Sequence, residues 1–238
     1  MNEFLRGLDM AKEHLIKSWG CDEAMLESGC HALDGAGFEA VGFGHGMVIR
    51  AVPEIAAWCR ERFKGVSPEF IFDGEHVYEL EKVLRRHGLM LQGTSTHYLL
   101  RDLRAWPLPE GYDYRLLTRP EVDALRPGDD FPFAFNGDGS DAIALTAERE
   151  GKLMALTSAD DLWGDLWQIG IQVLPETRQK GFACGLVSRL TQEIVALGKT
   201  PFYSTWAGNV GSTKTALKCG FFPAWISMRA IPTERGAG

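Results

Sequence analysis

The segment from Leu166 to Gly198 constrains the fold more than any other part of the chain, because it joins a predicted strand to a predicted amphipathic helix. Residues 166–173 alternate as a strand does, and Pro175 stops the strand because proline cannot donate to a sheet ladder. The helix begins near Gly181, and Gly198 stands where a left-handed C-terminal cap belongs. Its apolar positions recur at steps of three and four residues and are Leu186, Val187, Leu190, Ile194 and Leu197. The sequence therefore predicts a helix that packs on a sheet.

The turn before this helix carries amide donors and positive charge. It consists of Arg178, Gln179, Lys180, Gly181, Phe182 and Ala183, which we call the amide cradle. Amides at a helix start have no intrahelical partner, and the helix dipole favours negative charge there. Arg178 and Lys180 add charge, while the small Gly181 and Ala183 let an anion approach the backbone. The cradle predicts a diphosphate site, and the alternative is an ordinary turn with solvated basic residues.

A second motif lies downstream, where the strand-like run 201–206 precedes Asn209-Val-Gly-Ser212 and a short helix closed by Gly220-Phe221. The order Arg-x-x-Gly-x-Ala, then Asn-x-x-Ser, then Gly-Phe resembles the GNAT acetyltransferase superfamily over residues 112–232, as a two-domain bacterial-type member. The resemblance implies an α/β (α+β) fold with a mixed, mostly antiparallel central sheet flanked by helices. It also implies a first strand at 114–117, a helix from Pro120 and a hairpin through Glu150-Gly151.

The same resemblance implies that acetyl-CoA is the co-substrate and that no metal is needed. The amide cradle would hold the pyrophosphate, and the strand backbone near Val173 would pair with the pantetheine arm, with Val173 facing the thioester. Asn209 would help to fix the cofactor. Asparagine is also a favoured helix N-cap, so capping and cofactor contact both stay open for Asn209.

Catalytic groups are sparse. Many GNAT relatives place a tyrosine acid seven residues after the motif Asn, where this chain has Ala216, and a glutamate base near the fourth strand, where it has Trp167 and Gln168. Asp165 is a candidate base and Tyr203 a candidate acid for the departing thiolate. The alternatives are that Asp165 is a solvated loop carboxylate and that Tyr203 is a core residue with a tethered hydroxyl.

The segment Arg104–Gly111 is rich in proline and charge, which predicts a connector and a domain boundary near residue 108. Residues 1–107 would form a smaller N-terminal α/β domain of unknown role, and residues 108–238 the GNAT-like catalytic domain. Upstream, the patterns predict helices over the first 35 residues, at 53–63 and around 77–84, and strands at 46–51, 69–72 and 89–100. The N-terminal domain could be a degenerate copy of the downstream fold, although no motif repeats.

Composition excludes several classes of protein. The formal charge of −7 divides almost evenly between the halves, so nucleic-acid binding is not expected. No apolar run spans a membrane and no signal-peptide pattern begins the chain, so we expect a cytoplasmic protein without membrane contact. The five cysteines and six histidines lack metal-ligand spacing, and no disulfide framework is indicated. Cys184 lies in a helix first turn, where a thiol pKa can fall, although packing is the competing interpretation.

The sequence therefore predicts an acetyl-CoA-dependent N-acetyltransferase that acts on a primary amine of a small molecule or peptide by direct transfer in a ternary complex. The alternative is a catalytically silent CoA-binding regulatory or interaction module. A third hypothesis gives the N-terminal half the task of presenting a peptide amine. The acceptor would meet loops at 126–136 and 160–165, with Trp206 as a pocket residue. The acceptor identity stays open, and a homodimer is an open alternative to a monomer.

Overall fold

The computed structural model describes residues 2–125, 131–135 and 139–233. Their helices and strands follow the chain in this order: α1 Glu3–Trp19, α2 Glu23–Glu27, β1 Gly29–Asp34, β2 Phe38–Gly42, β3 Gly46–Ala51, α3 Pro53–Arg62, η1 Pro68–Phe72, α4 Gly74–Arg86, β4 Leu89–Leu100, β5 Asp113–Thr118, α5 Arg119–Ala124, β6 Asp141–Arg149, β7 Lys152–Trp163, β8 Leu166–Val173, η2 Pro175–Thr177, α6 Phe182–Ala196, β9 Thr200–Trp206, α7 Val210–Cys219 and β10 Phe221–Pro232. Both η elements are 3₁₀ helices.

The chain forms two compact units, and neither is a continuous piece of sequence. Unit 1 holds the residues up to Ala11 together with Tyr98–Pro223, and unit 2 holds Lys12–His97 together with the segment from Ala224. Strands β4 and β10 therefore contribute residues to both units. The predicted boundary near residue 108 falls inside unit 1, and the division of the fold occurs at other positions.

The connector Arg104–Gly111 lies inside unit 1 because it is bonded to two of that unit's helices. The Ser188 hydroxyl of α6 donates to the Arg104 carbonyl at 2.8 Å and accepts from the Trp106 amide at 3.1 Å. The Trp106 indole donates to the Lys218 carbonyl of α7 at 2.9 Å. At Gly185 of α6 a Cβ would lie only 2.8 Å from the Pro107 carbonyl oxygen. The close approach of the connector to α6 therefore requires glycine at this position. The punctuated segment is thus a packed strap over α6.

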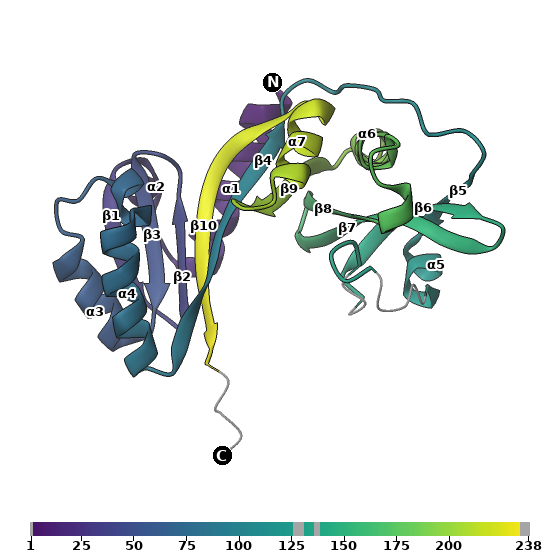
Figure 1. Cartoon of the computed structure of the whole chain (residues 1–238). Helices are drawn as coiled ribbons and strands as arrows, with labels where there is room; N and C mark the ends of the chain where they lie inside the picture. The colour runs from purple at the N-terminus through teal and green to yellow at the C-terminus, as the bar shows by residue number, and fades with distance from the viewer. Residues whose placement is uncertain (1, 126–130, 136–138, 234–238) are drawn as a thin grey trace, which may run out of the picture. The chain divides into compact units, whose positions relative to one another are not determined.

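Unit 1 is an α/β layer built on strands β5 to β9. Neighbouring strands from β5 to β8 pair antiparallel, and β8 pairs with β9 in parallel, which confirms the mixed, mostly antiparallel sheet. On β6, Ile143 and Leu145 contribute to the core under α6, while Ala144 belongs to the cluster with Val122 of α5. This alternation covers the sheet with α6 on one face and α5 on the other (Figure 1).

Unit 2 holds strands β1 to β3 and parts of β4 and β10. Strand β1 runs parallel to β3, and β2 runs antiparallel to both β3 and β10. Ile55 of α3 and Leu80 of α4 share one core cluster with Met47 and Ile49 of β3, so both helices pack on the same face (Figure 1). No helix within the described ranges combines the length and the apolar character that crossing a membrane requires.

Two upstream predictions are wrong. The run 69–72 is the 3₁₀ helix η1, because Pro68 fixes a helical φ at its first turn and four apolar residues are too few to reveal a period. The first 35 residues are not helical throughout, since they end in strand β1. The predicted elements at 46–51, 53–63, 77–84 and 89–100 are confirmed within a few residues, as are those from 114 onward.

Two glycines that end helices offer a matched test of packing in unit 1. Gly198 (φ +75°) follows α6, and Gly220 (φ +94°) follows α7. A Cβ at Gly198 would meet open space, whereas a Cβ at Gly220 would overlap the carbonyl oxygen of Asp102. The backbone is close there because the Asp102 amide donates to the Gly220 carbonyl at 3.2 Å. We expect Gly198→Ala to lower the free energy of unfolding by about 1–2 kcal/mol, the cost of a left-handed non-glycine residue.

Gly220→Ala adds displacement of the 98–104 backbone to that strain, so we expect a loss at least twice as large. Urea denaturation of the two variants and the wild type measures both values. Equal losses would show that the contact with Asp102 is not packed as described.

Candidate functional site

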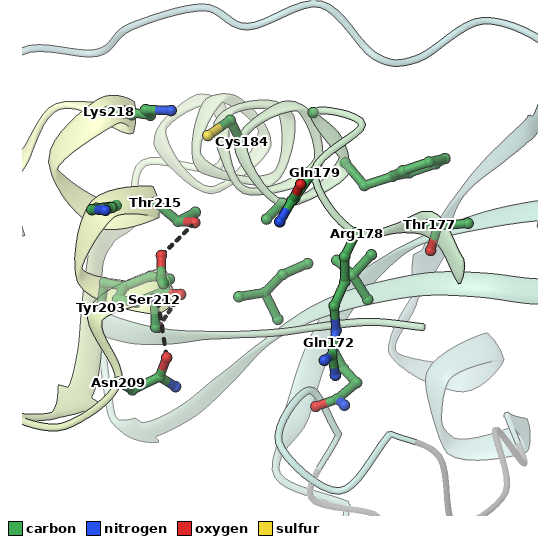
Figure 2. Close-up of a pocket in the computed structure, with 17 residues that line it drawn as sticks. Gln172, Thr177, Arg178, Gln179, Cys184, Tyr203, Asn209, Ser212, Thr215 and Lys218 are labelled. Carbon is green, nitrogen blue, oxygen red and sulfur yellow. Dashed lines mark hydrogen bonds between the residues drawn. The ribbon is translucent and has the colours of Figure 1, made fainter. Parts of the chain in front are cut away.

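A pocket of about 630 Å³ lies in unit 1, and its walls come from the segments singled out in the sequence. Figure 2 shows it with α6 and α7 on two sides and strands below. Its lining residues are Ile171, Gln172, Val173, Thr177, Arg178, Gln179, Gly181, Phe182, Ala183, Cys184, Tyr203, Asn209, Gly211, Ser212, Lys214, Thr215 and Lys218.

The pocket exists because β8 and β9 part. The two strands pair from Leu166↔Thr200 to Ile169↔Tyr203 and no further, although both continue. At the parting point the Gln168 side-chain amide donates to the Ser204 hydroxyl at 2.9 Å. Beyond it, the β8 edge that leads to Val173 faces the pocket with its backbone groups unpaired by β9. Such an edge binds an extended, amide-bearing chain in the way a sheet accepts an added strand.

The amide cradle closes one end of the pocket. Gly181 is the N-cap of α6 with φ +89°, and no side chain caps this helix, so its first-turn amides stay open to a ligand. Gln179 is also left-handed, at φ +62°. Buried Thr177 fixes the turn before it, since its hydroxyl lies 2.9 Å from the Leu174 carbonyl and 3.2 Å from that of Met154. The cradle thus has a defined backbone conformation, with helix-start amides that no side chain caps.

Positive charge surrounds this site. Arg178 lines the pocket as predicted, and Lys214 and Lys218, one turn apart on α7, line its other side. None of the three forms an ion pair with an acidic residue in the described part of the chain. The sequence analysis missed both lysines, although their spacing after the Asn-x-x-Ser motif was a usable signal. Lys180 is exposed and does not line the pocket.

Asn209 lies at the start of α7, and its capping role is confirmed. The Asn209 side chain accepts from the Ser212 amide at 3.1 Å. Asn209 also lines the pocket, so capping does not remove it from reach of a ligand. Contact with a cofactor stays a prediction.

Tyr203 reaches the pocket from β9 and is nearly inaccessible to solvent. Its hydroxyl lies 2.7 Å from the Ser212 hydroxyl, and either atom can donate. Burial raises the pKa of Tyr203 far above its ordinary value, so the phenol keeps its proton at every physiological pH. Ala216, where relatives carry tyrosine, is fully buried in the core.

The other predicted catalytic residue lies outside the pocket. Asp165 is exposed and bonded to the Lys199 ammonium at 2.6 Å. This bond and the lysine charge lower the pKa of Asp165, which makes the carboxylate a weaker base. The structure therefore brings Tyr203, Asn209 and the cradle together and leaves Asp165 apart.

The predicted acceptor loops are only partly described. Of the segment 126–136, residues 126–130 and 136 lie outside the described residues. Phe133 packs edge-to-face on Trp206 with centroids 5.5 Å apart, and both rings are mostly exposed. Trp206 does not line the pocket. Among the described residues, no three His, Cys, Asp or Glu side chains form a group that could hold a metal ion.

The chain is similar to known proteins in part of its sequence and in its fold. Residues 144–230 match the family model described as FR47-like protein. No curated protein matches the chain. A GNAT-family protein of Novosphingobium aromaticivorans has 18% identity over 60% of this chain and 66% of its own, with a TM-score of 0.47. A Drosophila protein has 19% identity over 68% and 59% of the two chains, with a TM-score of 0.50.

A Salmonella typhimurium protein solved with its cofactor acetyl-CoA has 15% identity over 54% of this chain and 98% of its own, with a TM-score of 0.39. The chain spans less than two thirds of the Novosphingobium and Drosophila proteins. The Drosophila likeness concerns the fold alone. Residues 144–230 are thus similar to the FR47-like family, and the chain shares the fold of the Drosophila protein.

Proposed function

We propose that the chain is an N-acetyltransferase that moves an acetyl group from acetyl-CoA to a primary amine of a small molecule or peptide, directly and in a ternary complex. One observation carries the proposal. The unpaired edge of β8 leads into the amide cradle within a single pocket, so one site offers both an extended hydrogen-bonding track and a diphosphate clamp. Pantetheine joined to a diphosphate has the same two parts in the same order.

Charge supports this ligand. Arg178, Lys214 and Lys218 border the pocket on both sides, and CoA carries its phosphates at one end of an otherwise neutral arm. A guanidinium can bind phosphate through two parallel hydrogen bonds, while lysine ammonium groups act as point charges. The Val173 end of β8 is the end that leads to the cradle, so it would lie along the pantetheine. The thioester would then lie farther toward Tyr203, not at Val173 as expected from the sequence.

Tyr203 would act on the departing sulfur. Because its pKa lies well above that of a thiol, the phenol donates a hydrogen bond to the developing thiolate rather than its whole proton. Ser212 holds the phenol oxygen in place at 2.7 Å. The amine acceptor would arrive unprotonated, since none of the described residues that line the pocket is a carboxylate or a histidine. Close positioning of amine and thioester supplies the remaining rate enhancement.

The alternative is a CoA-binding module without turnover. Two observations favour it, namely the buried Ala216 in place of the usual tyrosine and the position of Asp165 outside the pocket. This alternative predicts the same ligand and differs only in the chemistry.

Cofactor binding is the first test. We expect CoA and desulfo-CoA to bind with similar affinity in calorimetry, because the phosphates and the pantetheine supply the contacts. Arg178→Ala should weaken CoA binding about tenfold or more, the effect of one charged hydrogen bond. Arg189→Ala is the matched control, since Arg189 lies on the helix that follows Arg178 but pairs with Glu193 outside the pocket. No heat with either ligand would refute the proposal.

Turnover is the second test, and it uses Tyr203. We expect Tyr203→Phe to lower kcat about a hundredfold in thiol-release assays with acetyl-CoA and a panel of amines, while CoA affinity changes less than threefold. Tyr98→Phe is the matched control, because Tyr98 also bonds to α7, through Thr213 at 3.4 Å, without lining the pocket. Tight CoA binding with no release above background hydrolysis for any amine would establish the silent module instead.

A further inference from the structure

Two cysteines from neighbouring helices meet at the edge of the pocket. Cys184 lies in the first turn of α6, and Cys219 is the last residue of α7. The two residues are in contact, since the Cys219 thiol donates to the Cys184 carbonyl oxygen at 3.5 Å. Cys184 lines the pocket, and Figure 2 shows its sulfur on the side of α6 that faces α7. Cys219 is completely buried behind it.

The surroundings make the two thiols unequal. The hydrogen bond from Cys219 lowers the pKa of Cys184 to about 7 against the opposing effect of burial, with help from the Lys218 charge and the Thr215 hydroxyl. The same hydrogen bond and burial raise the pKa of Cys219. Cys184 is therefore the thiolate of the pair, and thiolates are the nucleophiles in disulfide exchange.

A second pair of cysteines in unit 2 provides an internal comparison. Burial raises the pKa of both Cys30 and Cys59 to about 12, so neither forms a thiolate near neutral pH. Neither lines the pocket. The chain thus holds one activated pair and one inert pair.

We propose that Cys184 and Cys219 are a redox-active thiol pair, in which Cys184 attacks a low-molecular-weight disulfide that enters the pocket and Cys219 resolves the product into a Cys184–Cys219 disulfide. The contact between Cys219 and Cys184, the access of Cys184 from the pocket and the burial of Cys219 carry this assignment.

The exchange balances in two steps. The Cys184 thiolate bonds to one sulfur of RS–SR and expels RS⁻, which leaves Cys184 as a mixed disulfide. Cys219 then gives its proton to an RS⁻ group, and its sulfur bonds to the Cys184 sulfur and expels the second RS⁻, which takes a proton from water. Two protein thiols are oxidised, and one disulfide is reduced to two thiols. The first step also removes the hydrogen bond and the charge that raise the pKa of Cys219, so it prepares the second.

The disulfide would alter the pocket, a consequence that rests on the proposed function. A covalent bond of about 2 Å between the two sulfurs would tie the first turn of α6 to the end of α7. That turn carries Phe182 and Ala183, whose amides belong to the cradle. We therefore expect the oxidised protein to bind CoA at least tenfold more weakly, with recovery in dithiothreitol.

The pair is tested with glutathione disulfide and peptide mass mapping of the full chain. Wild type should yield linked peptides from α6 and α7, while Cys30 and Cys59 stay reduced. Cys219→Ser should accumulate a glutathione adduct on Cys184, and Cys184→Ser should give neither product. The proposal fails if wild type keeps both thiols free, or if Cys30 and Cys59 react as fast. The wild-type result decides even where a variant does not fold.

Calorimetry with CoA on the reduced and oxidised wild type separates this inference from the proposed function. Equal affinities in the two states would overturn the effect on the pocket. A linked pair in a protein that binds no CoA when reduced would support the thiol pair and overturn the proposed function.

Discussion

The parting of β8 from β9 is the feature on which the rest of the site depends. The two strands pair up to Ile169↔Tyr203 and then diverge, so backbone groups on the β8 edge lose their strand partner. Buried backbone groups need partners, and a ligand that carries amides can supply them. The same pocket takes in the open amides at the first turn of α6, Arg178 from the turn before α6, and Lys214 and Lys218 from α7.

The chemistry of the site follows from how few titratable groups line it. Apart from the cations, Tyr203 and Cys184 are the only titratable side chains among the described residues that line the pocket, and burial holds Tyr203 in its protonated form. A site of this kind favours transfer by positioning and hydrogen bonding over proton abstraction by the protein. Cys184 has no part in that transfer, and its contact with Cys219 at the edge of the pocket is the basis of the redox proposal.

Local patterns predicted most elements of unit 1. The strand at 166–173, the helix after Gly181 and the cap at Asn209 were readable because each depends on residues close together in the chain. Short apolar runs could not be assigned in this way, and residues 69–72, predicted as a strand, belong to a 3₁₀ helix. The connector was also misleading, because its prolines indicate a break in regular structure, whereas its bonds to Ser188 and Lys218 hold it in place.

By itself, the sequence determined the two motifs, the cradle, the cap and the resemblance to GNAT proteins, all of which rest on short-range spacing and backbone preference. Only the tertiary structure decided which distant residues meet. It placed Lys214 and Lys218 opposite Arg178, joined Cys184 to Cys219 and separated Asp165 from the pocket. The physical reason is that such contacts depend on how helices pack across a sheet. The periodicity of the sequence shows which face of an element is buried but not which distant residues that face contacts.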